Sequence, residues 1–126
     1  MPATLQVHQQ PRPQVIHGEK MNPPIEIQAI IPSNSPGFTN IGNLTAMAAV
    51  YDNNDNPLQY HEYEGVWGTR APGVQTVGGN KVVTFTFPDL KIDRLGTLYV
   101  RVAVHYTDAQ GSVVLSSDDS WKFMVE

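Results

Sequence analysis

The chain has 126 residues, which is about the size of one domain, and it contains no cysteine. The absence of cysteine excludes disulfide bonds, thiol catalysis and metal sites built on sulfur, and a chain of this length buries enough surface to fold without them. A net charge of −4 argues against strong nonspecific attraction to nucleic acid.

Neither a secretion signal nor a membrane span is predicted. The first residues show no basic stretch followed by an apolar run. No segment approaches the ~18 consecutive apolar residues that a membrane span requires, so we expect no membrane partner. A cysteine-free chain fits a reducing compartment, which favours a nuclear or cytoplasmic location, although secreted proteins without cysteine also exist.

In the first half of the chain, several segments alternate apolar and polar residues as strands do. Leu5 and Val7 alternate with polar neighbours, and residues 25–31 alternate after a Pro-Pro pair that disfavours a helix start. Residues 44–51 predict a strand of small side chains, followed by an Asp- and Asn-rich turn and further extended residues at 58–61. Residues 9–21 and 32–43 are irregular, so we expect two long loops, which often carry binding residues.

The second half of the chain carries the clearest strand pattern. Residues 97–107 alternate, which predicts a long strand with one buried and one wet face. The predicted buried face carries Leu98, Val100, Val102, Val104 and Tyr106, and the wet face carries Thr97, Tyr99, Arg101, His105 and Thr107. Residues 81–87 repeat the pattern, with Val83, Phe85 and Phe87 toward the core.

The chain closes on a third alternation, in which Trp121, Phe123 and Val125 are predicted to face the core. The serines and aspartates of residues 112–120 indicate a polar turn region before it. Short strands separated by turn residues therefore predict an all-β fold, an antiparallel sandwich or a small barrel. Residues 1–126 are expected to form a single domain.

Two segments resemble metal sites but lack the geometry for one. In the sequence His61-Glu62-Tyr63-Glu64, a strand would place the histidine on the face opposite the two glutamates, so the ligands would not converge. The Asp- and Asn-rich segment 52–56 resembles the start of a calcium loop, but Pro57 stands where that loop needs glycine. We therefore predict no metal and no other cofactor.

No constellation of residues indicates catalysis. There is no nucleophile elbow, and the Gly78-Gly79 pair is too short to cradle a phosphate. Asp118 and Asp119 are neighbouring carboxylates in the predicted wet turn, where solubility and turn formation explain them. The sequence therefore predicts that the protein is not an enzyme.

Four cations and two aromatic residues are candidates for binding. Arg12 and Lys20 fall in the first predicted loop, and Lys91 and Arg94 flank the turn before the longest strand. If the loop and the turn meet at one end of the sandwich, the four cations form a cluster; otherwise they are scattered surface charges, the interpretation that charge alone favours. Tyr63 and Trp67 lie near predicted loops, where exposed aromatic side chains often anchor protein interfaces.

The order of several short motifs points to a family. They are Gln9-Gln10-Pro11, Gly18-Glu19-Lys20, Pro23-Pro24-Ile25, Phe87-Pro88-Asp89-Leu90 and Gly96-Thr97 followed by Arg101. In this order the chain resembles the velvet domain of fungal regulators, from about Leu5 to Val125. The resemblance implies an immunoglobulin-like sandwich related to Rel-type DNA-binding domains, dimerisation, a nuclear location and control of fungal development and secondary metabolism.

One departure from the velvet pattern concerns DNA. In the family, the Gly-Glu-Lys element leads into a run of basic residues that contact DNA, whereas here Lys20 is followed by Met21 and Asn22. The resemblance therefore leaves Lys20 and Arg12 as DNA-contact candidates, and it implies a homodimer or a related protein partner with weakened DNA binding. The alternative is a fungal sandwich protein, secreted or not, that recognises a protein or glycan ligand and does not bind DNA.

Overall fold

A computed structural model describes residues 2–126, which form strands joined by turns, with two short 3₁₀ helices. The strands are β1 (Thr4–Gln9), β2 (Gln14–Val15), β3 (Glu26–Ile31), β4 (Leu44–Asp52), β5 (Tyr63–Glu64), β6 (Thr69–Arg70), β7 (Gln75–Val77), β8 (Asn80–Thr86), β9 (Lys91–Ile92), β10 (Gly96–Asp108), β11 (Gly111–Asp119) and β12 (Phe123–Val125). The 3₁₀ helices are η1 (Ile41–Asn43) and η2 (Tyr60–Glu62).

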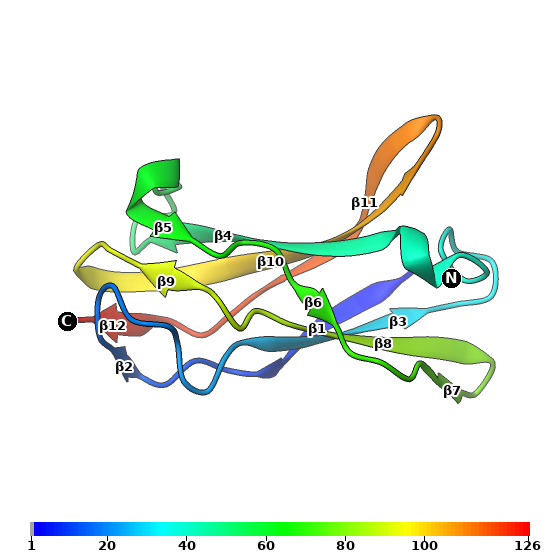
Figure 1. Cartoon of the computed structure of the whole chain (residues 1–126), viewed down its shortest axis with the longest axis horizontal. Helices are drawn as coiled ribbons and strands as arrows, with labels where there is room; N and C mark the ends of the chain where they lie inside the picture. Colours follow the sequence, from blue (N-terminus) through cyan, green and yellow to red (C-terminus); the bar gives the residue numbers. More distant parts are fainter. Residues whose placement is uncertain (1) are drawn as a thin grey trace.

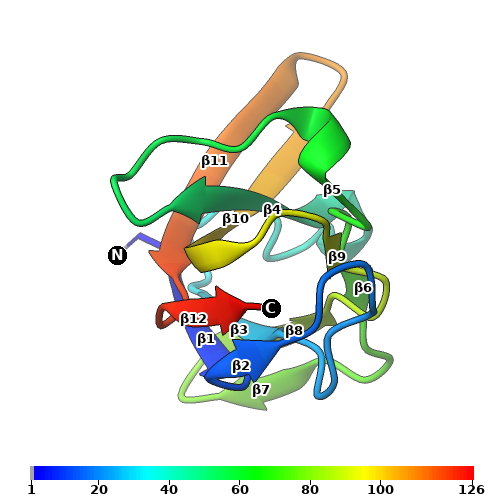
Figure 2. The same cartoon turned by 90° about the vertical axis from the view of Figure 1, so that its left-hand side faces the viewer.

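Two main sheets face each other, as Figures 1 and 2 show. In the first, which we call the β8 sheet, β3 lies between β1 and β8, and β6 and β7 also pair with β8. In the second, the β10 sheet, β4 runs along one edge of β10, while β11 and β12 follow each other along the opposite edge. β2 extends this sheet by pairing in parallel with β12, and a separate small ribbon joins β5 to β9.

The core lies between the two sheets and is filled by the alternating residues that the sequence indicates. On β10, Leu98, Val100, Val102 and Val104 are each at most 1% exposed. Facing them from the β8 sheet are the buried side chains Ile25, Ile27, Ala29, Ile31, Val83, Phe85 and Phe87. The predicted fold class, an all-β immunoglobulin-like antiparallel sandwich, is therefore confirmed.

The predictions of which side chains are buried and which are exposed were wrong for Tyr99 and Trp121. Tyr99, expected on the wet face, is only 5% exposed because it stacks on Tyr51 with ring centroids 5.4 Å apart. Its hydroxyl donates a hydrogen bond to Asp55, and burial raises the pKa of this phenol. Trp121, expected in the core, is 71% exposed because β12 begins two residues later, at Phe123.

Two segments have a different secondary structure from the one expected. Most of residues 112–120, predicted as a polar turn region, belong to the long strand β11, which pairs with β10 and has a bulge where the register shifts between Val104 and His105. Beyond this bulge the β10–β11 hairpin projects from the body of the sandwich (Figure 1). Residues 58–61, predicted as extended, overlap η2, in which Glu62 accepts a hydrogen bond from the Gln59 amide at 3.0 Å.

The first prediction tests the buried face of β10. Val102→Asp places a carboxylate at a position that is fully buried, and an uncompensated buried charge costs about 3 kcal/mol or more. We expect the Val102→Asp variant to lose the cooperative thermal unfolding transition. Circular dichroism as a function of temperature measures this loss. Thr107→Asp introduces the same charge at an exposed position of the same strand and is expected to unfold like the parent. A fully folded Val102→Asp variant would contradict the assigned face.

Candidate functional site

Two segments that lie far apart in the sequence meet at the end of the sandwich that carries the C-terminus (Figure 1). The Gly18 amide donates to the Ile92 carbonyl at 2.9 Å, and the Met21 amide donates to the Leu90 carbonyl at 3.2 Å. Lys20 and Lys91 face each other across an isolated antiparallel bridge. The first predicted loop and the segment containing Lys91 are therefore neighbours in the fold.

The ribbon of β5 and β9 is held in place by a glycine contact. Gly65 follows β5 with a φ of +77°, a conformation that L side chains rarely adopt. A Cβ atom added there would lie 1.9 Å from the Asp89 carbonyl oxygen. Only glycine allows this approach of the two backbones, so the position of β5 against residues 89–92 depends on Gly65.

Three of the four candidate DNA-contacting cations form ion pairs at this end. Lys20 Nζ lies 2.9 Å from Asp89 Oδ1, and Lys91 Nζ lies 3.9 Å from Glu64 Oε1. Arg94 Nη1 lies 3.2 Å from Glu62 Oε2, in an exposed pair that forms part of the η2 region. The segments meet as the cluster hypothesis requires, but carboxylates are interleaved with the cations, so these three side chains do not form a purely positive patch.

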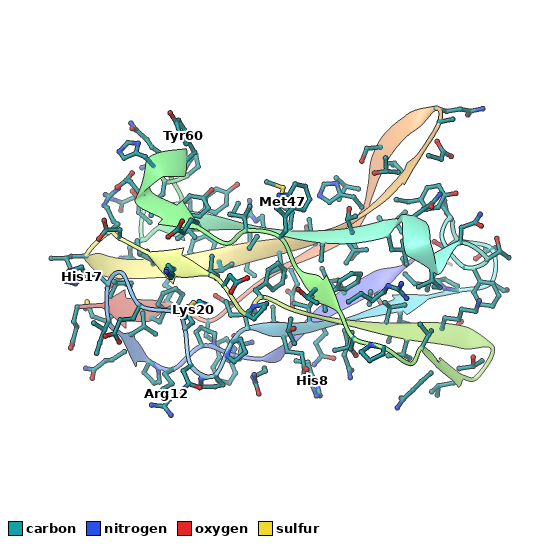
Figure 3. All side chains as sticks on the ribbon, viewed as in Figure 1. His8, Arg12, His17, Lys20, Met47 and Tyr60 are labelled. Atoms are coloured by element: carbon teal, nitrogen blue, oxygen red, sulfur yellow. The ribbon has the colours of Figure 1, made fainter. Side chains whose placement is uncertain are left out.

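Arg12, the fourth candidate cation, lies at the same end, as Figure 3 shows for Arg12 and Lys20. It lines a hollow of about 230 Å³ together with Lys20, Glu19 and both residues of β2. Glu19 adds a further negative charge to this surface. Because phosphate groups are repelled by neighbouring carboxylates, Glu19 lowers the attraction of this surface for polyanions.

A cleft of about 380 Å³ opens beside η2. It is lined by Gly18, Tyr60, His61, Tyr63, Glu64, Lys91 and Asp93. Tyr60 is 88% exposed, and its ring meets that of His61 edge to face at 5.9 Å between centroids. The cleft is a mixed aromatic and charged surface, and two of its members, Tyr60 and Asp93, were not singled out from the sequence.

The backbone around this cleft is fixed by hydrogen bonds from η2. The Glu62 side chain accepts from the Gln59 amide, and this bond lowers the pKa of Glu62. The Glu62 carbonyl accepts from the Asp93 amide at 2.8 Å, which joins η2 to the residue after β9. The sequence signal for such a cap is Ser, Thr, Asp or Asn followed three residues later by Glu or Gln, and Gln59 at the N-cap departs from it, so the signal does not identify η2.

The two predicted interface aromatics occupy different surfaces. Tyr63 is half-buried, packs against the core and lines the cleft beside η2. Trp67 is 62% exposed and faces Met47 across an isolated bridge beside β4. The amide of Ala48 donates to Val66 at 2.8 Å, and the amide of Gly68 donates to Ala46 at 2.9 Å, so the Trp67 segment is fixed along the free edge of β4.

Asp118 and Asp119, expected in a wet turn, belong to β11 and have separate structural partners. Asp118 Oδ2 accepts from the Val7 amide at 3.0 Å, which links the two sheets along one side. Asp119 accepts two hydrogen bonds from Arg101, at 2.8 and 3.2 Å, and this pairing raises the pKa of Arg101. The two carboxylates therefore do not act as a pair.

Residues 2–126 contain no group of three or more histidine or carboxylate side chains placed to hold a metal ion. Within the same residues, no helix has the length and apolar character of a membrane span.

Comparison with known proteins gives weak structural likenesses. No protein-family model matches the chain, and no curated protein is significantly similar in sequence. The sandwich overlaps part of a ceramidase complexed with C2 and of the neutral ceramidase from Pseudomonas aeruginosa, each with a TM-score of 0.47 and 12% identity. These matches cover 95% and 96% of this chain but only 18% and 19% of the ceramidase chains.

A further likeness involves AggA, the major subunit of the type I aggregative adherence fimbriae of Escherichia coli. It has a TM-score of 0.34 and 14% identity over 99% of this chain and 95% of that chain. At this level of identity and overlap, these likenesses indicate neither a shared activity nor a shared partner.

The close approach of Gly65 to Asp89 generates a stability prediction. Gly65→Ala combines an unfavourable backbone conformation with a direct overlap, whereas Gly18→Ala has nearly the same φ, +75°, and no atom within 4 Å of the new Cβ. We expect Gly18→Ala to lower the free energy of unfolding by about 1–2 kcal/mol and Gly65→Ala by clearly more. Urea denaturation measures both, and equal losses would contradict the role given to the close approach.

The ion pairs generate a prediction about DNA. We expect duplex DNA to bind no more tightly than about the micromolar nonspecific range at physiological salt. In a salt titration with fluorescent duplex, an Arg12→Ala, Lys20→Ala double variant should reduce the slope by about 0.9 for each phosphate that it no longer neutralises. Asp89→Asn should strengthen binding at low salt, because it frees Lys20 from its partner.

The control for this titration is Lys122→Ala, which removes a cation that lies with Arg101 and Asp119 on the β10 sheet. It should leave the slope unchanged. Nanomolar, sequence-selective binding that survives physiological salt would contradict the expectation of weak binding.

Proposed function

We propose that this protein is a non-enzymatic interaction domain that acts as a homodimer, or with a related protein partner, through the outer face of its β10 sheet. The observation that carries the proposal is a row of exposed apolar side chains on that face, centred on Trp67 and Met47. DNA binding is at most a weak, secondary property in this proposal.

The register of the strands places the row. Met47 pairs with Ala103 of β10 and with Trp67 on its other side, and directly paired residues project to the same face of a sheet. Figure 3 shows Met47 on the side of the β10 sheet that points away from the β8 sheet. Ser117 of β11 is the partner of Ala103 on the other side, and at the next outward position of β10 the exposed Val114 pairs with His105.

The charges around this row are satisfied within the chain. Two residues before Ala103 on β10, the Arg101 guanidinium lies 4.6 Å from the centre of the Tyr51 ring and donates hydrogen bonds to both carboxylate oxygens of Asp119. A partner that covers the row would not have to neutralise an unpaired charge there. Exposed tryptophan and methionine at the centre, with paired charge at the rim, is the composition of a protein interface.

The velvet-like regulator remains a proposal that rests on the order of the sequence motifs. A dimer formed through the β10 sheet agrees with it, and the proposal includes a nuclear or cytoplasmic location. Weak DNA binding is supported by the ion pairs of Lys20, Lys91 and Arg94. The nuclear role would be tested by locating the tagged protein in its source cell, where secretion would contradict it.

The interface generates a prediction about self-association. The parent chain should sediment as a dimer at micromolar concentration, and Trp67→Ala should weaken the dimer roughly 30-fold, as expected for loss of about 2 kcal/mol at an interface centre. Trp121→Ala is the matched control, because Trp121 is also an exposed tryptophan, at 71% against 62% for Trp67, and it lies in the connection between β11 and β12, where its amide donates to the Gln10 side chain. Analytical ultracentrifugation over a concentration series measures both variants.

Two results would contradict the proposed interface. A parent chain that sediments as a monomer at every accessible concentration would exclude the homodimer. A dimer that Trp121→Ala weakens, and Trp67→Ala does not, would place the interface elsewhere.

A further inference from the structure

The cleft beside η2 combines aromatic rings with an uncompensated carboxylate. We propose that it binds a ligand carrying an organic cation, an ammonium or guanidinium group, which belongs either to a small amine or to a lysine or arginine side chain of a peptide. This site is separate from the proposed dimer face, and its occupation does not depend on dimerisation.

The aromatic part of the cleft is open to a ligand. Tyr60 is 88% exposed, and its ring is perpendicular to that of His61. Tyr63 adds a third ring, which is half-buried and held against the core. The faces of tyrosine rings carry negative electrostatic potential and attract cations, so rings that surround one hollow suit a positively charged group.

The charges of the cleft favour the same ligand. Its lining contains two carboxylates, Glu64 and Asp93, and one ammonium group, that of Lys91. Lys91 lies 3.9 Å from Glu64, whereas the Asp93 carboxylate has no ion pair within the described residues 2–126. One negative charge therefore remains to attract a cation, and the same charge disfavours phosphates and other anions.

The site is fixed before a ligand arrives. The Asp93 amide is bonded to the Glu62 carbonyl, and the Gly18 amide is bonded to the Ile92 carbonyl, so both walls are tied to β9 and η2. Gly18 contributes only backbone to the lining. The volume of about 380 Å³ lies within the range of small-ligand pockets, roughly 300–1,000 Å³, and at its lower end, which suits a single cationic group.

A neutral sugar is the principal alternative occupant, because sugars also stack on tyrosine rings and bond to carboxylates. Sugar binding does not require the surplus negative charge that Asp93 supplies. The dependence of binding on that charge therefore distinguishes the two ligand classes.

The test is a titration of the isotope-labelled full chain by nuclear magnetic resonance, with choline chloride as the probe at constant ionic strength. We expect saturable shifts of the Gly18, His61 and Asp93 amides, with a dissociation constant of about millimolar. The neutral analogue of choline, in which a tert-butyl group replaces the trimethylammonium group, should not shift them. A blocked tripeptide with a central lysine tests whether a peptide side chain also enters the cleft.

Variants locate the site. Tyr60→Ala should weaken choline binding about threefold, as expected for one exposed cation–π contact. Asp93→Asn should weaken it about fivefold, as expected for one charge near the surface. Asp108→Asn is the matched control, since it removes a carboxylate in the turn of the β10–β11 hairpin and should leave binding unchanged.

Three outcomes would overturn the proposal. They are equal binding of choline and its neutral analogue, binding that Asp93→Asn leaves unchanged, and shifts of the same amides by a neutral oligosaccharide with no dependence on Asp93. The third outcome would assign the cleft to a sugar.

Discussion

The alternation of β10 side chains between the two faces of its sheet is the constraint on which the rest of the structure depends. Its even-numbered residues from Leu98 to Val104 fill the core, while its odd-numbered residues form the outer face of the β10 sheet. β4 pairs along one edge of this strand over nine residue pairs, from Leu98 to Tyr106. A shift of the pairing by one residue would turn the core residues of β4 outward, so burial of the inner face also fixes which side chains reach the outer one.

The outer face inherits its composition from this register. Met47 stands between two buried residues of β4, Ala46 and Ala48. Because successive side chains of a strand point to opposite faces, the burial of the two alanines places Met47 on the exposed face. The segment containing Trp67 then bonds to the backbone of those same two alanines. The exposed apolar row is therefore produced by backbone pairing that the core already determines, and a partner can cover it without any rearrangement of the sheet.

Local patterns predict the core because burial on a strand repeats every second residue, as in the Val83, Phe85 and Phe87 series. They fail where an interaction between distant residues decides the outcome. Tyr99 is buried by Tyr51 and Asp55, which no periodicity of β10 could reveal. The serines and aspartates of residues 112–120 predict a turn because they lower strand propensity, yet pairing with β10 makes most of this region the strand β11.

The candidate sites, like the core, were predictable from the sequence only where the outcome did not depend on interactions between distant residues. The positions of Lys20 and Lys91 allowed them to be neighbours, and the structure makes them so. Their carboxylate partners could not be identified, because Asp89 and Glu64 reach them through the backbone contact at Gly65. A count of cations along a sequence therefore overstates the positive potential of a surface when the fold interleaves carboxylates among them.

The short segment from Tyr63 to Gly68 connects the two proposed surfaces. Tyr63 lines the cleft beside η2, Gly65 lies close to the Asp89 carbonyl, and Trp67 lies on the outer face of the β10 sheet. The segment is bonded to β9 at one end and to β4 at the other through backbone groups. The close approach at Gly65 requires glycine, whereas these backbone bonds do not involve the side chains of Tyr63 and Trp67. Side chains on this segment can therefore change the ligand of either surface while the backbone that presents them stays in place, which is the usual advantage of binding residues carried on a rigid sandwich.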